Sequence, residues 1–216
     1  KALEKYFGLD DSYPATSVIP FSSDRKYSGA VFGDDTYIIG APEFVLKSSF
    51  EKYAKMVNDE ANKGYRVLCF ATTKQDLVNS KLSRPAKPIA FVMIEDQIRS
   101  DAPETIKYFR ESGVEVKVIS GDNPVTVSEV AKRVGIASAE NYISLDGLTE
   151  EEVYDAATKY TVFGRVKPDQ KQIIVKALKA HEKTVAMTGD GVNDILAMKE
   201  ADCAVAIAAG SEAARS

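Results

Sequence analysis

Residues 184–194 read TVAMTGDGVND, and this stretch decides the fold. Its apolar start, residues 185–187, is typical of a buried parallel strand, which the glycines that follow would end. Asp190 would then emerge at the carboxyl end of the strand, where open α/β sheets place their ligands. The stretch therefore predicts an open α/β sheet with a metal-binding carboxylate at its edge.

Asn193 and Asp194 follow at the expected start of a helix over residues 195–199. Either side chain suits the free N–H groups of that helix, so capping alone is one interpretation of the pair. A Gly-Asp-Gly on its own is common turn chemistry. The complete TGDGVND heptapeptide is more specific, and it resembles the Mg²⁺-site motif of P-type ATPases, the ion pumps built on a haloacid dehalogenase core.

Residues 119–122 read ISGD after an apolar run, the pattern of a second strand that ends in a glycine turn. The hydroxyl of Ser120 is small enough to donate to a phosphoryl oxygen without crowding it. Asn123 and Pro124 predict the N-cap and first residue of a helix that continues over residues 126–134. An ordinary strand–helix junction has the same sequence pattern. The functional interpretation of this motif therefore depends on the other motifs.

Residues 163–171 read FGRVKPDQK, and Pro168 predicts the start of a helix over residues 168–181. Lys171 would lie one turn into that helix, from where its ammonium group reaches the neighbouring sheet edge. A lysine on a helix is usually solvated surface. In this order of segments, the resemblance assigns the family's phosphate-binding lysine to Lys171.

Residues 95–99 read EDQIR, which resembles the Asp-Pro-Pro-Arg hinge between the nucleotide and phosphorylation domains of these pumps. Gln97 and Ile98 stand where the family has prolines, whereas Asp96 and Arg99 match. In the family this Asp and Arg help to hold the nucleotide-bound state. The alternative interpretation is a surface ion pair worth less than about 1 kcal/mol.

The first ninety residues have a different pattern, with short apolar runs between polar turns, and predict a small strand-rich α+β unit. Strands are expected over 18–21, 27–32, 36–39 and 66–73, a hairpin turn at 33–35, and helices over 2–7 and 50–63. Residues 19–26, IPFSSDRK, resemble the adenine-binding stretch of P-type nucleotide domains. Residues 40–43, GAPE, resemble their Lys-Gly-Ala-Pro-Glu loop, with Ile39 in place of the lysine.

The resemblance implies a role for each residue that matches a family motif. It implies Mg²⁺ and ATP as cofactors, with Asp190 as the metal ligand. Phe21 would stack on the adenine, and Lys26 and Arg66 would lie near the phosphates. The catalytic residues would be Ser120, Lys171, Asp190, Asn193 and Asp194. The nucleotide-binding residues would be Phe21, Lys26, Gly40, Ala41, Arg66, Asp96, Arg99, Gly121, Asp122 and Arg165.

The composition suits one or two globular domains: 216 residues, 44% hydrophobic, with a net charge of −4. The 28 basic and 32 acidic residues are interspersed, which argues against a nucleic-acid partner. No apolar run is long enough to span a membrane. Cys69 and Cys203 lie far apart, each in an apolar strand, so we expect two buried, reduced thiols. His181 stands alone near the end of a helix.

The fold class that we expect is α/β in two domains. Residues 1–94 would form the α+β nucleotide-binding domain, and residues 95–216 a doubly wound, haloacid dehalogenase-like phosphorylation domain. Strands of the second domain are expected over 89–94, 114–120, 162–164, 185–188 and 203–207, and helices over 102–112, 126–134, 150–159, 168–181 and 195–199.

The sequence contains no Asp-Lys-Thr-Gly-Thr, the motif that carries the family's nucleophilic aspartate. We therefore expect a partial phosphorylation domain that lacks its first strand, has an open groove in its sheet and is inactive alone. In the parent pump it would serve at the cytoplasmic face of the membrane, with the membrane and actuator domains of the same protein as partners. Two alternatives are a soluble haloacid dehalogenase-type phosphatase with an inserted cap, and a non-catalytic nucleotide-sensing module.

Overall fold

The computed structural model describes residues 2–8, 12–77, 81–95, 97–189 and 191–207. The chain forms two compact units. The first contains Lys1–Val57 and Val67–Ile94, and the second contains Asn58–Arg66 and Glu95–Ser216. Among the described residues, no helix combines the length and the apolar character that crossing a membrane requires.

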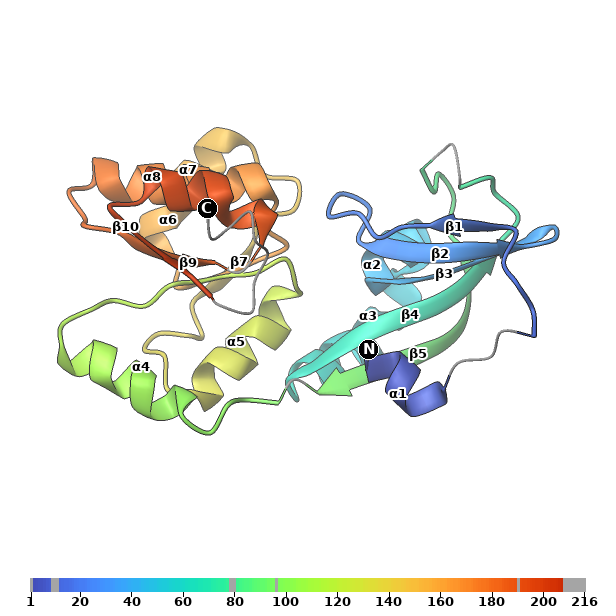
Figure 1. The fold of residues 1–216 in the computed structure, drawn as a ribbon, viewed down its shortest axis with the longest axis horizontal. Coiled ribbons are helices and arrows are strands. Elements are labelled where there is room, and N and C mark those ends of the chain that lie inside the picture. Colours follow the sequence, from blue (N-terminus) through green and yellow to red (C-terminus); the bar gives the residue numbers. More distant parts are fainter. Residues whose placement is uncertain (1, 9–11, 78–80, 96, 190, 208–216) are drawn as a thin grey trace. The chain divides into compact units, whose positions relative to one another are not determined.

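The first unit is built on a five-stranded sheet with the order β1-β2-β3-β4-β5 (Figure 1). Its strands are β1 (Ser17–Ile19), β2 (Tyr27–Phe32), β3 (Asp35–Gly40), β4 (Tyr65–Thr73) and β5 (Lys87–Glu95). Pairing from β1 to β4 is antiparallel. In the β2–β3 hairpin Phe32 pairs with Asp35, and Gly33 turns with a φ of 58°, which confirms the predicted turn.

Helices of the first unit supply the other half of its core. They are α1 (Ala2–Phe7), α2 (Pro42–Leu46), the 3₁₀ turn η1 (Lys47–Ser49) and α3 (Glu51–Ala61). Alternate residues of β3 and β4 are buried, so one face of the sheet is apolar and covered. On that face Ile38 and Cys69 join Val45 and Leu46 of α2, and Tyr53 of α3 packs against the same cluster.

The second unit alternates strands and helices, and its strand pairs are parallel. One sheet has the order β6-β8-β7, and a second pairs β10 with β9. The strands are β6 (Val118–Ile119), β7 (Tyr142–Ser144), β8 (Val162–Gly164), β9 (Ala186–Gly189) and β10 (Cys203–Ala206). The helices are α4 (Ala102–Glu111), α5 (Pro124–Arg133), α6 (Glu150–Lys159), α7 (Pro168–Ala180), the 3₁₀ turn η2 (Val192–Asp194) and α8 (Ile195–Glu200).

Helices lie on both sides of these strands, with α6, α7 and α8 on one side and α5 on the other (Figure 1). Phe163 of β8 and Ile174 of α7 are fully buried in the largest apolar cluster of this unit. Within the described residues, β6 ends one sheet and β9 ends the other, and the expected open groove stays a prediction. The structure is thus a mixed α/β fold, and the doubly wound topology stays a prediction.

Some expected elements differ from the structure. The strand expected over residues 114–120 is reduced to Val118–Ile119, the two residues that have register partners in β8. The expectation did not include β7 or α2. The strand expected over 89–94 in the second domain is β5, which belongs to the five-stranded sheet of the first unit. Helix α4 has the predicted position but buries none of its side chains.

The two cysteines are reduced thiols, as predicted. Cys69 is buried, and that burial raises the pKa of its thiol to about 11. The expectation of a buried Cys203 is wrong. Its strand, β10, pairs with β9 alone in the part of the chain that the structure describes, and Cys203 is exposed to solvent.

Candidate functional site

The ISGD motif forms a tight turn directly after β6. The Ser120 N–H donates to Phe163 O at 2.9 Å, which continues the pairing of β6 with β8 for one residue. The Asp122 N–H donates to Ser120 Oγ at 3.1 Å, and that hydroxyl lies 3.4 Å from Asp122 Oδ2. Ser120 is therefore held by its own turn at the carboxyl end of β6, the position that the sequence predicts.

Helix α5 begins immediately after this turn. Asn123 Oδ1 accepts the Val125 N–H at 2.9 Å, and Pro124 occupies the first helical position, which confirms both predictions. A Cβ on Gly164 would lie 2.5 Å from Pro124, so a glycine in β8 is needed for the helix to start here. The sequence analysis missed this role of Gly164, for which the only signal was a glycine inside an apolar strand.

Arg66 and Asp122 form an ion pair, with 2.5 Å between Nη2 and Oδ2. Both side chains are about one-third exposed. Segment 63–66 is held to α5 by two further contacts. Thr126 Oγ1 donates to Tyr65 O at 3.0 Å, and Arg133 donates to Lys63 O. The structure thereby brings together two residues that the resemblance assigns to nucleotide binding.

Arg165 lies on the other side of the same turn. Its N–H donates to Asp122 O at 2.8 Å, and its Nη1 donates to Gly121 O at 3.1 Å. Arg165 is buried and has a φ of 53°, an unusual conformation for a residue with a side chain. The backbone of the ISGD turn is therefore fixed by Arg165, one of the predicted nucleotide-binding residues.

Lys171 lies in the first turn of α7, as predicted, and forms an ion pair with Asp194. The distance from Nζ to Oδ1 is 2.6 Å, and the two side chains are only 16% and 9% exposed. The other carboxylate oxygen of Asp194 accepts the Gly191 N–H at 3.2 Å. Asp194 makes no side-chain cap to α8; its hydrogen bond with the Gly191 N–H lies instead at the start of the 3₁₀ turn η2.

The position of Asp194 also explains why β9 ends in a glycine, Gly189. A Cβ on Gly189 would lie 2.5 Å from the Cβ of Asp194, so any larger residue would displace the carboxylate. Asn193 lies in η2 and is exposed. Asp190 lies outside the described residues, as does Asp96.

The structure does not describe a complete set of ligands for the predicted Mg²⁺ ion. Among the residues that the structure describes, which do not include Asp190, no three His, Cys, Asp or Glu residues are grouped in a way that could hold a metal ion. The donor chemistry nevertheless fits Mg²⁺, because carboxylate oxygens are its usual protein ligands. Asp194 is the described carboxylate of the TGDGVND segment.

In the first unit, the loop between β1 and β2 carries Phe21, whose side chain is 64% exposed. Lys26 closes this loop: its N–H donates to Ser22 O at 2.8 Å, and its carbonyl accepts the Ala41 N–H at 2.9 Å. Lys26 has a φ of 55° and is largely buried. The FSSDRK and GAPE segments, which are distant in sequence, are therefore adjacent.

Gly40 ends β3 opposite Tyr27 of β2. A Cβ at this position would lie 2.4 Å from Lys26 O and from the Tyr27 Cβ, so the sheet itself requires glycine here. Ala41 is buried directly before α2. These contacts explain why the GAPE segment has small residues at positions 40 and 41. Its close approach to a nucleotide stays a prediction.

Ile39 lies on the face of β3 opposite the buried residues Ile38 and Gly40. It pairs with Phe70 of β4, and the Phe70 ring stacks on Tyr37 with centroids 5.9 Å apart. This face is therefore apolar and aromatic at the position where the family has a lysine. The sequence analysis missed Tyr37 and Phe70, although the alternation along β3 and β4 placed them on one face.

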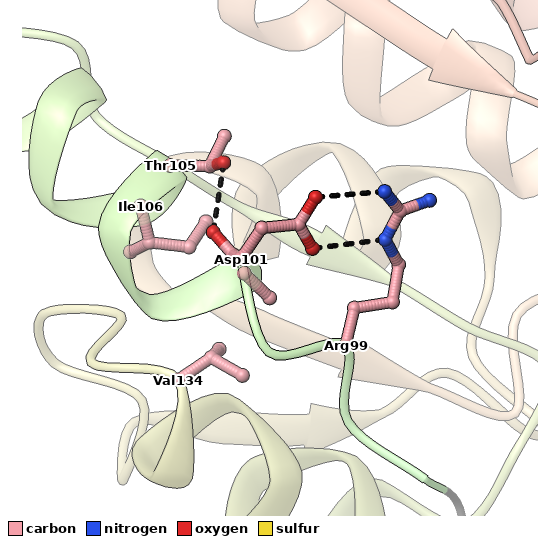
Figure 2. Close-up of a pocket in the computed structure, with 6 residues that line it drawn as sticks. Arg99, Asp101, Thr105, Ile106 and Val134 are labelled. Atoms are coloured by element: carbon pink, nitrogen blue, oxygen red, sulfur yellow. Dashed lines mark hydrogen bonds and ion pairs between the residues drawn. The ribbon is translucent and has the colours of Figure 1, made fainter.

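Arg99 is exposed in the second unit and forms an ion pair with Asp101 (Figure 2). The Nε–Oδ1 and Nη2–Oδ2 distances are 3.0 and 2.7 Å, and these hydrogen bonds lower the pKa of the Asp101 carboxyl below its ordinary value. The pair lies beside a depression of about 360 Å³. Its lining residues are Arg99, Asp101, Ala102, Thr105, Ile106 and Val134.

Comparison with known proteins identifies the family. A family model described as haloacid dehalogenase-like hydrolase matches residues 5–202. The whole chain is 41% identical to a probable cation-transporting ATPase, exp7, of Streptococcus pneumoniae, and 40% identical to the calcium-transporting ATPase CtpE of Mycobacterium bovis.

A further relative, the cation-transporting ATPase pma1 of Synechocystis, is 33% identical over 96% of the chain. The chain spans only 26% to 28% of the length of these three relatives. The motif resemblance to P-type ATPases is thus confirmed along the whole sequence. The chain belongs to the haloacid dehalogenase-like hydrolase family, and its relatives are cation-transporting ATPases.

Proposed function

We propose that this chain is the nucleotide-binding and phosphorylation-site part of a P-type cation pump. Such a pump couples ATP hydrolysis, through an aspartyl phosphate, to the transport of a cation. The observation that carries the proposal is the buried Lys171–Asp194 pair. It joins the FGRVKPDQK and TGDGVND motifs, which the resemblance assigns to the same chemistry.

Base recognition is proposed for the first unit. Phe21 presents an exposed ring, and stacking of a base on an aromatic ring contributes about 1 to 3 kcal/mol. The apolar surface around Ile39 suits a base better than it suits phosphate. Lys26, Gly40 and Ala41 hold the loop that carries Phe21 to the start of α2.

Phosphate recognition and phosphoryl transfer are proposed for the second unit. Arg66 and Arg165 supply positive charge at the ISGD turn, and Gly121 and Asp122 form its backbone. Ser120 would hold a phosphoryl oxygen, and the Lys171 ammonium would neutralise charge that develops on the transferred group. Asp96 and Arg99 would stabilise the nucleotide-bound state.

Mg²⁺, when bound, would supply electrostatic stabilisation of the transferred phosphoryl group. Asp190 would be its protein ligand, with Asn193 and Asp194 in the same segment. Lys171 Nζ holds one oxygen of the Asp194 carboxylate in place at 2.6 Å, and the Gly191 N–H holds its second oxygen. These residues thereby orient the carboxylate before any ligand arrives.

In this proposal residues 1–94 form the nucleotide-binding domain and residues 95–216 a partial phosphorylation domain, at the cytoplasmic face of a membrane. The membrane and actuator domains of the same pump would be the partners. The pump is favoured over a capped phosphatase and over a nucleotide-sensing module, because the relatives that match the whole chain are named as cation-transporting ATPases.

The test uses the chain and a full-length pump that contains it, incubated with Mg²⁺ and ATP labelled at the γ-phosphate. We expect acid-stable, hydroxylamine-sensitive label on the full-length protein and none on the 216-residue chain, because no Asp-Lys-Thr-Gly-Thr occurs in the chain. Label on the isolated chain would refute the assignment of the nucleophile. A full-length protein that hydrolyses phosphate esters without forming a phosphoenzyme sensitive to cation would favour the phosphatase.

A further inference from the structure

The loop that carries Phe21 is closed by hydrogen bonds on both sides of that residue. The carbonyl of Pro20, directly before Phe21, accepts a hydrogen bond from Arg25 Nη2 at 2.8 Å. The carbonyl of Ser22, directly after it, accepts the Lys26 N–H at 2.8 Å. The Phe21 side chain is nevertheless 64% exposed. The first unit thus presents an apolar ring to solvent on a main chain that is held at both neighbouring residues.

Arg25, a residue of the same loop without a role in the proposed function, rests against a rigid support. Its guanidinium carbon lies 5.8 Å from the centre of the Tyr27 ring, which is within the range of a cation–π attraction. Tyr27 is buried in the core of the first unit, and its hydroxyl accepts the Leu82 N–H at 3.0 Å. The Arg25 side chain therefore connects the Pro20 carbonyl to a fixed ring of the core.

One donor of Arg25 remains unused in this arrangement. Its Nε–H is shielded from solvent and has no hydrogen-bond partner among the residues that the structure describes. A shielded donor without a partner costs free energy. The contacts with Tyr27 and Pro20 hold the guanidinium in place against that cost, which indicates that the position of this side chain matters.

An anchored loop favours the binding of a base. If the loop were mobile, its ordering would cost main-chain and side-chain entropy at the moment of binding. The two anchors make that ordering a part of folding instead. The Ser22 anchor is a main-chain hydrogen bond, whereas the Pro20 anchor comes from a side chain, so a substitution of Arg25 removes the second without altering the first.

We propose that Arg25 is a positioning residue for base recognition: it holds the Pro20 carbonyl, and thereby the Phe21 ring, in place for stacking. The inference rests on the proposed recognition of a base by Phe21. A basic side chain beside a nucleotide site could instead bind phosphate. The hydrogen bond of Nη2 to Pro20 and the position of the guanidinium over Tyr27 favour the positioning role.

The test compares adenosine, which has no phosphate, with AMP, which has one. Each is titrated into the 216-residue chain and followed by NMR. We expect Arg25→Met, which keeps the length of the side chain and loses its donors, to weaken both ligands about fivefold, because the loop must then be ordered on binding. Arg84→Met removes the same charge from an exposed position in the same unit, and this matched control should change neither ligand.

A second readout needs no ligand. In the unliganded wild type, the ¹H–¹⁵N nuclear Overhauser effects of the Phe21 and Ser22 amides should equal those of β2, and Arg25→Met should lower them. Mobile Phe21 and Ser22 amides in the wild type would overturn the proposal without any variant. If Arg25→Met does not fold, Arg25→Gln takes its place; its shorter side chain does not reach from Tyr27 to Pro20, so adenosine should again bind more weakly.

The outcomes distinguish a positioning role from the other roles of an arginine. A loss of AMP affinity with unchanged adenosine affinity would show a phosphate contact and overturn the proposal. A lower melting temperature with unchanged affinity for both ligands would show a purely structural role and overturn it as well. Either result leaves the proposed base recognition standing. A wild-type chain that binds neither adenosine nor AMP would overturn base recognition, and the positioning role with it.

Discussion

Lys171 and Asp194 are ion-paired at 2.6 Å, between the first turn of α7 and the junction of η2 with α8. The lysine comes from the FGRVKPDQK segment and the aspartate from TGDGVND. Both are mostly shielded from solvent, and the aspartate also binds the Gly191 N–H. One contact therefore fixes the relative position of two motifs that the family uses for phosphoryl transfer.

The first prediction concerns stability. Asp194→Ala leaves the Lys171 ammonium shielded and without its counter-ion, so the free energy of unfolding should fall by about 3 kcal/mol. Chemical denaturation of the isolated chain measures it. Asp155→Ala, which breaks the exposed pair with Lys159, should cost less than about 1 kcal/mol. Equal losses in the two variants would contradict the importance of the Lys171–Asp194 pair.

The second prediction concerns the base site. Around 5 kcal/mol of binding free energy corresponds to a dissociation constant on the order of 0.2 mM, which we expect for adenine nucleotides. Phe21→Ala removes the stacking ring and should weaken binding by about 1 to 3 kcal/mol. Ile39→Lys restores the family's positive charge and should tighten ATP more than adenosine.

The matched control is Tyr13→Ala, which removes an exposed ring of the same unit outside the FSSDRK loop. It should leave nucleotide affinity unchanged. Wild-type affinity in Phe21→Ala, measured by NMR titration, would refute the assignment of the base site.

The third prediction concerns the thiols. Burial raises the pKa of Cys69 to about 11, so at pH 8 nearly all of it is protonated and shielded. A thiol reagent should therefore modify the exposed Cys203 within minutes and Cys69 only after denaturation. Mass spectrometry of the labelled peptides gives the result. Rapid labelling of Cys69 under native conditions would contradict its burial in the core.

Much of the fold follows from local sequence pattern. The bounds of α6 and β8 match the expectation, because Thr149 and Glu152 form a capping box and an apolar run marks the strand. The short β6 and the unexpected β7 depend instead on pairing with β8. Whether a residue joins a β-sheet depends on a neighbouring strand that is distant in sequence. The local sequence pattern does not contain that information.

In the candidate site, too, some features could be predicted from the sequence and others could not. Motif order identified Ser120, Lys171 and Arg165 as site residues, and the structure places Ser120 and Arg165 on one turn. The sequence did not predict that Arg66 binds Asp122, a contact across 56 positions. Such a pair depends on the contacts of residues 63–66 with α5, which only the folded chain specifies.

The last prediction tests Asp190, the residue on which the fold and function were first argued. Asp190→Asn keeps the shape of the side chain and removes one negative charge from the expected Mg²⁺ shell. Phosphoenzyme formation by a full-length pump should therefore fall steeply, because Mg²⁺ stabilises charge on the transferred phosphoryl group, whereas nucleotide binding should barely change. The measurement is labelling across a Mg²⁺ titration, with thermal melts of the same variants. The matched control is Asp155→Asn, which removes one negative charge from an exposed pair on α6 and should leave labelling intact. Wild-type labelling and Mg²⁺ dependence in Asp190→Asn would show that this aspartate is not a metal ligand.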